Sequence, residues 1–382
     1  MRITIVGAGP VGLLLSCLLS ANHTVTVIDK RNESTRSHSL NINVETVTVI
    51  VDYIRNNMVI SSDLEEMLHI WSDNPVSTVE IEEKLTEIAI GLGVIIRRGI
   101  NITSLDTIDD FVIIGADGAK SKIRSLVFND DLVDIHNVQY MAQLKYHTPG
   151  ATRPRLAVSA ASYSFLNGLS GSDMVIDFES LAPPNDNFRK HGTLHIPIPE
   201  SAYNMLTKNG KGTYANPWTI EELQSIRSDE DLYLIAKLIR IIKRYDFSLR
   251  WRGGWLEDPK ITVIPLTIYR STDVVRLLDN NKLVMLVGDS ASGLVFQRGL
   301  NKGWLEAVQC ARTLNTNDPN ALSLALAEYS QYCKTVYESE RDAVLEKHRK
   351  IISSNKVTSV TGVILTSGLG LLFGSVMSKS LK

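Results

Sequence analysis

Cysteine is scarce in this chain, with three residues in 382, and an excess of one charge sign is missing. Cys17, Cys310 and Cys333 form neither a Cys-x-x-Cys pair nor a metal-ligand spacing, so we expect no disulfide framework and no metal site. The 40 Lys and Arg residues nearly balance the 42 Asp and Glu residues, for a formal net charge of -2. Because phosphate backbones are bound by a clustered positive excess, this balance predicts no nucleic-acid partner.

We also expect no signal peptide, and the sequence shows no internal repeat and no low-complexity linker. The apolar run over residues 2–6 leads directly into a glycine turn, which leaves no room for a cleavable leader. Together with thiols that have no pairing pattern, this predicts a cytoplasmic protein. Hydrophobic residues make up 44% and charged residues 21%, which is typical of globular domains and excludes disorder or a fibrous repeat.

The first thirty residues have the order strand, glycine turn, helix, strand, acid. The turn reads Gly7-Ala8-Gly9-Pro10-Val11-Gly12, and the second apolar run ends at Asp29. Gly7 permits a tight exit from the first strand, Gly9 lets backbone N–H groups approach a pyrophosphate, and Gly12 lets the helix pack closely. A carboxylate at the position of Asp29 can accept hydrogen bonds from ribose hydroxyls. This order predicts dinucleotide binding and leaves FAD and NAD as alternatives.

The later segments predict interleaved domains. Alternating patterns over 139–147, 193–198, 248–255 and 261–269 indicate strands, and periodic patterns over 78–92, 220–226, 232–242, 300–314 and 320–352 indicate helices. The predicted division is a discontinuous dinucleotide-binding domain over 1–75, 76–137 and 281–315, a sheet-rich substrate domain over 138–280, C-terminal helices over 316–356 and an apolar tail over 357–382.

Two later motifs specify the cofactor. Gly115-Ala116-Asp117-Gly118 follows an apolar run, and Gly288-Asp289-Ser290 follows another, eleven residues before Gly299-Leu300-Asn301-Lys302-Gly303. With the first turn and Asp29, these resemble the three fingerprints of the FAD-dependent aromatic hydroxylases (class A flavoprotein monooxygenases), the family of p-hydroxybenzoate hydroxylase and kynurenine 3-monooxygenase. The resemblance covers residues 1 to about 315. It implies an α/β fold in which a Rossmann-like FAD-binding domain is interleaved with a substrate domain built on a mixed or antiparallel sheet.

The resemblance also implies which residues contact FAD. The turn would hold the pyrophosphate, Asp29 the adenosine ribose, Arg36 the region near the phosphates, and Asp289 the ribityl or ribose region. The backbone at Leu300 and Asn301 would face the flavin N1/O2 edge, where a helix N-terminus stabilises negative charge. The full predicted cofactor-binding set is Gly7, Gly9, Pro10, Val11, Gly12, Asp29, Lys30, Arg36, Asp117, Gly118, Gly288, Asp289, Gly299, Leu300 and Asn301.

The implied activity is that of a monooxygenase that uses FAD and NADH or NADPH. It would insert one oxygen atom from O2 into a small aromatic or apolar substrate through a flavin C4a-hydroperoxide. The cofactor supplies this reactivity, so no catalytic side chain is assigned.

The sequence departs from the family pattern at Val79, Ser290, Ser292 and Phe296. These departures keep two alternatives open, an FAD-dependent reductase or dehydrogenase of the same fold and a non-catalytic FAD-binding protein. A halogenase is disfavoured because no Trp-x-Trp-x-Ile-Pro stretch is present.

Substrate contacts are expected from the middle sheet. The candidates are His195, Trp251, Trp255, Tyr269 and Arg270. For each of them a structural role is the stronger expectation: the two tryptophans as core residues of one strand face, the histidine as a satisfied sheet residue and the arginine as a solvated strand end. The pattern does not identify the substrate, the choice between NADH and NADPH, or the oligomeric state.

The C-terminal stretch Val357–Met377 contains 21 residues without a charge. Eleven are apolar, four are glycine and six are Ser or Thr, and Gly370–Gly374 matches a GxxxG pattern. At about 1.5 Å per residue a helix of this length just spans a hydrocarbon core of about 30 Å. The sequence therefore leaves two alternatives, membrane association through this tail or a C-terminal helix or hairpin docked on the protein body.

Overall fold

The computed structural model describes residues 1–33, 39–57, 62–72, 74–149, 177–178, 189–226, 232–250, 254–294, 298–316, 321–346 and 349. The described chain forms two compact units. The first comprises Met1–His136 and Thr267–Val344, and the second comprises Asn137–Leu266 and the described residues after Val344. The boundaries fall inside two long strands, β7 (Leu132–Pro149) and β10 (Glu257–Ser271).

The first unit is built on a six-stranded sheet in the order β11-β12-β6-β1-β2-β5. All neighbouring pairs are parallel except β11 with β12. Every residue of β6 and β12 is buried, as expected for strands covered by helices on both faces. The strands are β1 (Arg2–Val6), β2 (Thr24–Asp29), β5 (Ile95–Arg98), β6 (Val112–Gly115), β11 (Val275–Leu277) and β12 (Leu283–Leu286).

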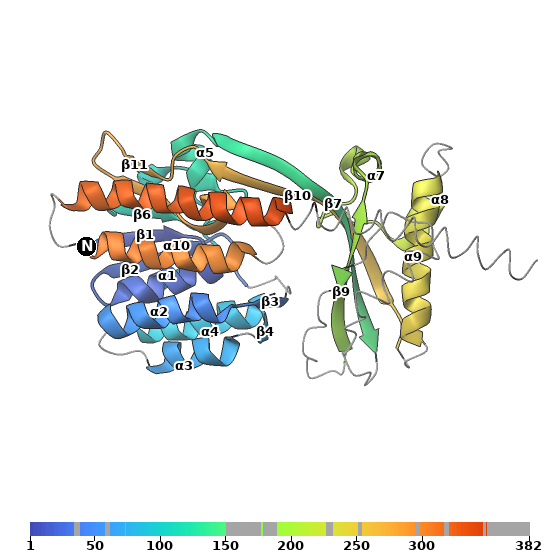
Figure 1. Ribbon diagram of the computed structural model, residues 1–382, viewed down its shortest axis with the longest axis horizontal. Helices are drawn as coiled ribbons and strands as arrows, with labels where there is room; N and C mark the ends of the chain where they lie inside the picture. The colour runs from blue at the N-terminus through green and yellow to red at the C-terminus, as the bar shows by residue number, and fades with distance from the viewer. Residues whose placement is uncertain are drawn as a thin grey trace, which may run out of the picture. The chain divides into compact units, whose positions relative to one another are not determined.

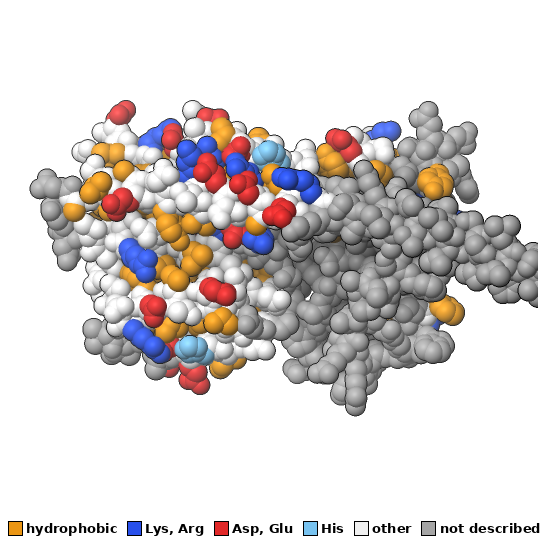
Figure 2. Space-filling model, in the orientation of Figure 1, with side chains coloured by type: hydrophobic (Ala, Val, Ile, Leu, Met, Phe, Trp, Pro, Cys, Tyr) orange, Lys and Arg blue, Asp and Glu red, His pale blue; other side chains and the backbone are white. Residues whose placement is uncertain are grey.

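Helices cover this sheet (Figure 1). The central one is α1 (Pro10–Ser20), whose residues Leu13–Leu19 are all buried because it packs against both α4 and α10. The others are α2 (Val44–Asn57), α3 (Ser62–Trp71), α4 (Thr78–Gly91), α5 (Lys122–Phe128), α10 (Arg298–Leu314) and the helical residues 321–346. Acidic and basic side chains are interspersed on the face of this unit shown in Figure 2. Short strands β3 (Ser39–Asn41) and β4 (Pro75–Ser77) pair with each other.

The second unit packs helices on one face of an antiparallel sheet, in which the strand order is β10-β7-β9-β8. Alternate residues of β7, Ala142, Leu144 and Tyr146, enter one core with apolar residues of the helices. Strand β13 (Ser292–Gly293) pairs with Tyr269 and Arg270, at the end of β10 that belongs to the first unit. The remaining elements are β8 (Asp177–Phe178), β9 (Arg189–Ile198), α7 (Glu200–Leu206), α8 (Ile220–Ser225) and α9 (Leu232–Arg250).

The predicted fold class, a Rossmann-like sheet interleaved with a second sheet, is confirmed. The strand predicted over 248–255 is wrong, because α9 continues to Arg250. Buried residues Ile235, Leu238, Ile242 and Leu249 recur at three-, four- and seven-residue spacing, and this helical periodicity extends past residue 242, where the predicted helix ended. Trp255 lies outside any strand and is 45% exposed, so it is not a core residue. Trp251 lies outside the described residues.

Candidate dinucleotide-binding site

The glycine turn after β1 contains two positions that accept only glycine. Gly7 has φ +117°, and a Cβ added there would lie 2.3 Å from the backbone oxygen of Ala116. A Cβ on Gly12 would lie 2.0 Å from the oxygen of Gly7, because α1 begins directly against the turn. Gly9 is different, since a Cβ there would meet no atom within 4 Å. The turn therefore presents open space at Gly9, beside N–H groups of the first turn of α1 that have no acceptor within the helix.

The three sequence motifs meet at this turn. Ala116 of the second motif contacts both Gly7 and Gly12. In the third motif, an added Cβ on Gly288 would lie 3.2 Å from Val11 Cγ1, and one on Gly303 would lie 2.7 Å from Val11 Cγ2. Segments more than 280 residues apart in the sequence thus close around the N-terminus of α1.

Asp29, at the end of β2, is almost fully buried, and its carboxylate accepts four hydrogen bonds. The donors are the N–H of Ala8 (2.7 Å) and, from Arg31, the N–H (2.7 Å), Nε (3.1 Å) and Nη2 (3.0 Å). Burial by itself raises the pKa of Asp29, but these hydrogen bonds outweigh it and hold the pKa below its usual value. The carboxylate is therefore an anion whose acceptor positions are filled by Arg31.

Arg31 and Glu82 were not predicted as site residues. Arg31 Nη1 lies 3.5 Å from Glu82 Oε1, and Glu82 on α4 is completely buried. Among the residues that the structure describes, Glu82 Oε2 has no hydrogen-bond partner. The available signal was an acid at position 82, three and seven residues before the apolar Leu85 and Ala89 of the predicted helix. Of the other predicted residues nearby, Lys30 is exposed and Arg36 lies outside the described residues.

Asp117 of the second motif holds the start of α5. Its carboxylate accepts from Ser121 Oγ (2.5 Å) and from the N–H groups of Lys122 (2.5 Å) and Ile123 (3.3 Å), while Gly118 takes a φ of +85°. Burial raises the pKa of Asp117 despite these bonds. In this arrangement the carboxylate serves as a helix cap, and a cofactor contact from Asp117 remains a prediction.

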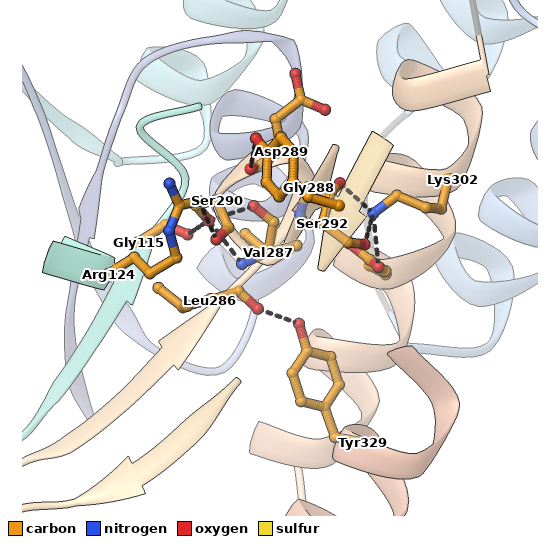
Figure 3. Close-up of polar contacts among 12 residues, drawn as sticks. Gly115, Arg124, Leu286, Val287, Gly288, Asp289, Ser290, Ser292, Lys302 and Tyr329 are labelled. Atoms are coloured by element: carbon orange, nitrogen blue, oxygen red, sulfur yellow. Dashed lines mark hydrogen bonds and ion pairs between the residues drawn. The ribbon is translucent and has the colours of Figure 1, made fainter. Parts of the chain in front are cut away.

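The third motif is tied to the second by buried polar contacts (Figure 3). Arg124 of α5 is 2% exposed and donates from Nη1 to the oxygen of Ser290 (3.0 Å). The Ser290 hydroxyl lies against the carbonyl oxygens of Gly115 and Val287 and accepts the Val287 N–H (3.1 Å). Gly288 adopts φ +66°. Asp289 is half-buried, and an added Cβ on Gly299 would lie 3.1 Å from its Oδ1.

Helix α10 begins next to this loop. Asn301 accepts the N–H of Asn43 (3.0 Å) and donates to the oxygen of Asn41 (3.0 Å), which fixes the first turn of α10 against the segment after β3. Leu300 is 9% exposed. The structure thus brings Gly299 beside Asp289, and Leu300 and Asn301 follow it in the first turn of α10.

A buried ion pair lies under the same loop, between Lys302 and Glu306 of α10. Both side chains are completely buried, with Nζ 2.9 Å from Oε1. Lys302 also donates to the backbone oxygen (2.8 Å) and Oγ (2.6 Å) of Ser292, and Glu306 Oε2 accepts the Gly288 N–H (2.8 Å). Burial raises the pKa of Glu306, with Lys302 acting in the opposite direction. Sequence reasoning missed this pair, although two opposite charges spaced i, i+4 in a largely apolar part of the predicted helix were a signal.

The residues that were predicted as candidates for substrate contact lie in different surroundings. Tyr269 is 8% exposed; its ring packs on Gly293 and its hydroxyl donates to the oxygen of Asp289 (2.8 Å), so it forms part of the wall of the third motif. Burial raises the pKa of Tyr269 well above its usual value. Arg270 is half-buried, with Nε 3.8 Å from Asp134 Oδ2, rather than a solvated strand end. The backbone of His195 pairs in β9, and its side chain lies outside the described part of the chain.

The residues at which the sequence departs from the family pattern lie in different surroundings. Val79 is half-buried in the first turn of α4, and Ser292 contacts Lys302. Phe296 lies outside the described residues.

Comparisons with known proteins bear on the fold. A family model described as an NAD(P)-binding Rossmann-like domain matches residues 5–73. A search of curated proteins finds no match. Among solved structures, a mutant of the halogenase PltM in complex with FAD is similar with TM-score 0.55 and 14% identity, over 94% of this chain and 77% of that one.

Two further solved structures are similar. The oxygenase of 2-methyl-3-hydroxypyridine-5-carboxylic acid has TM-score 0.53 and 14% identity, over 94% of this chain and 92% of its own. The Diels-Alderase PyrE3 has TM-score 0.52 and 16% identity, over 94% of this chain and 79% of that one. The chain therefore has the fold that a flavin-containing halogenase and an oxygenase share, as the motif resemblance predicted. Since a Diels-Alderase shares it too, the fold alone does not determine the reaction.

Proposed function

We propose that the chain is an FAD-dependent oxidoreductase, and more specifically a monooxygenase. The observation that carries the proposal is the convergence of three motifs on the glycine turn, with open space at Gly9 in front of α1. The N-terminus of α1 would bind the pyrophosphate through its unpaired N–H groups and partial positive charge. Similarity to FAD-containing and oxygenase structures supports this assignment.

At the adenosine end, the geometry indicates what Asp29 and Arg31 would do. For Asp29 to accept ribose hydroxyls, the guanidinium of Arg31 must give up its bonds to that carboxylate. Glu82 Oε2 is a buried acceptor that has no partner within the described part of the chain, so Arg31 can keep an anionic partner after this shift. At the other end, the first turn of α10 at Leu300 and Asn301 would stabilise negative charge on the flavin.

When bound, FAD supplies electron transfer from NADH or NADPH and the reaction with O2; the chain supplies binding, orientation and exclusion of water. The substrate expected for this site is a small aromatic or apolar molecule.

The test is to purify the chain, titrate it with FAD, and record the flavin absorbance spectrum and the quenching of flavin fluorescence. NADH and NADPH are then offered with a panel of aromatic and apolar substrates while oxygen uptake and product mass are followed. A monooxygenase places one atom of the consumed oxygen in the product. A colourless chain that does not take up FAD contradicts the cofactor assignment. A flavin-loaded chain that neither nucleotide reduces contradicts the oxidoreductase assignment.

A second candidate, a reductase or a non-catalytic FAD-binding protein, is favoured by one observation. The loop after Asp289 carries Ser292 hydrogen-bonded to the buried Lys302, where the resemblance leads us to expect a histidine. Reduction of a substrate without incorporation of oxygen in the same assay identifies the reductase.

Membrane association through the C-terminal stretch Val357–Met377 is part of the proposal. Those residues lie outside the described part of the chain; among the described helices, every one is too short or too polar to cross a bilayer. When the membranes are washed at high salt, which screens electrostatic attachment, deleting residues 357–382 is expected to move the protein from the membrane pellet to the supernatant. A fractionation that is unchanged by the deletion contradicts the anchor.

A further inference from the structure

Helix α9 of the second unit presents a straight stripe of five side chains away from its core. Tyr233, Lys237, Arg240, Arg244 and Phe247 follow one another at spacings of four, three, four and three residues, which places them on one helix face. The opposite face, with Ile235, Leu238, Ile242 and Leu249, is buried. Tyr233 is 69% exposed and Phe247 71% exposed, so an aromatic ring stands in solvent at each end of the stripe.

The stripe concentrates positive charge in a chain whose net charge is -2. Helix α9 contains five Lys or Arg residues and a single acid, Asp246. That acid accepts from Arg250 Nε (2.7 Å) and from the Leu256 N–H (2.8 Å), so it does not neutralise the stripe. Within the described residues, Lys237, Arg240 and Arg244 form no ion pair; Lys237 lies 5.8 Å from the centroid of the Tyr233 ring.

Helices α8 and α9 lie next to each other (Figure 1). Residues of both helices line an open apolar groove of about 640 Å³ beside the stripe. Leu223, Ile226, Ile235 and Ile239 supply its apolar surface, and the cationic and aromatic side chains lining it are Arg240, Lys243, Arg244 and Phe247. A cationic rim next to an apolar floor complements an amphiphile that has an anionic head and a hydrocarbon chain.

We propose that this face of α9 docks on an anionic phospholipid bilayer, with the cations at the headgroups and the two aromatic rings at the boundary with the acyl chains. A nucleic acid or an acidic peptide would satisfy the cations but would leave the apolar groove without a matching ligand. Amphipathic helices that lie on membranes combine basic residues with exposed aromatic and aliphatic side chains in this way. The inference does not depend on FAD binding or on the activity of the chain.

The test measures partition of the full chain into vesicles of neutral phosphatidylcholine and into vesicles that also contain 30% phosphatidylserine, about that fraction being enough to give a strong surface potential. The ratio of the two partition coefficients isolates the electrostatic term, because an apolar contribution from the C-terminal tail is common to both. At low salt, K237Q/R240Q/R244Q is expected to lower the ratio by on the order of 100-fold, since each cation near the surface contributes separately. Raising the salt concentration lowers the wild-type ratio toward that of the variant.

The matched control is K208Q/K260Q/K334Q, which removes three exposed cations outside α9 and should leave the ratio within about twofold of wild type. Y233S/F247S should weaken partition into both vesicle types several-fold. Circular dichroism and thermal unfolding confirm that the variants are folded.

A wild-type ratio near one, or equal ratios for wild type and K237Q/R240Q/R244Q, overturns the proposal. So does a triple variant that loses binding to polyglutamate or an oligonucleotide while its vesicle ratio is unchanged.

Discussion

Replacing Gly7 with alanine is expected to remove FAD binding and to lower the free energy of unfolding by about 3 kcal/mol or more. The added Cβ would lie 2.3 Å from the backbone oxygen of Ala116 and 2.8 Å from the backbone nitrogen of Asp117. These are backbone atoms of the second motif, so relief requires the two loops to separate. The φ of +117° adds strain for any L side chain. Urea denaturation and FAD titration measure the two effects.

Gly9→Ala is the matched control for Gly7→Ala, because it adds the same methyl group two residues away. Gly9 has φ -84° and ψ 176°, which alanine adopts without strain, and the added Cβ meets no protein atom within 4 Å. The free energy of unfolding should therefore stay within about 0.5 kcal/mol of wild type. FAD affinity should still fall at least tenfold, because the methyl group enters the space proposed for the pyrophosphate. Wild-type affinity in Gly9→Ala would place the cofactor elsewhere; wild-type stability in Gly7→Ala would mean that the turn and second motif are not in contact.

The second large effect is expected from the buried pair under the Gly288–Ser292 loop. Lys302→Met removes the cation from a completely buried Glu306 and should lower the free energy of unfolding by about 3–5 kcal/mol, because an uncompensated charge is left inside the protein. The double variant K302M/E306Q removes both charges and keeps an acceptor for the Gly288 N–H. It should therefore be more stable than Lys302→Met alone, and a double-mutant cycle in urea measures the coupling.

An exposed pair on the same unit provides the control for Lys302→Met. Lys84 and Glu87 form an ion pair at 2.8 Å on the surface of α4, and Lys84→Met should change the free energy of unfolding by no more than about 0.5 kcal/mol. A small effect for Lys302→Met, equal to that of the control, would contradict the prediction that an uncompensated charge is left inside the protein.

The residues of the site that could be predicted from the sequence are those whose type is fixed by the local backbone geometry. Gly7 and Gly12 could be identified because a strand that turns directly into a helix leaves no room for a side chain at those two positions. The hydrogen bonds of Asp117 show the limit of such reasoning. The same motif letters fit a cofactor ligand and a helix cap, and only the position of Ser121 and of the start of α5 shows that the carboxylate is used as a cap.

Other site residues could not be identified because their partners are distant in sequence. Glu82 lies 51 residues after Arg31, and Lys302 reaches Ser292 across the turn into α10. Charged side chains in predicted helices are ordinarily solvated, so neither the position of Glu82 on an apolar helix face nor the i, i+4 spacing of Lys302 and Glu306 was enough to identify them as enclosed groups. The error at residues 248–255 has a related cause, since a short alternating stretch at the end of a helix resembles a strand until the core that the helix faces is known.

The sequence by itself determined the opening order of strand, glycine turn, helix and strand up to Asp29, and the class of ligand that this turn suits, because steric limits on the backbone act over a few residues. The tertiary structure alone decided that Arg31 occupies the carboxylate of Asp29 and that Lys302 and Glu306 are enclosed together. Those outcomes depend on desolvation and on packing between segments that meet only when the sheet is assembled.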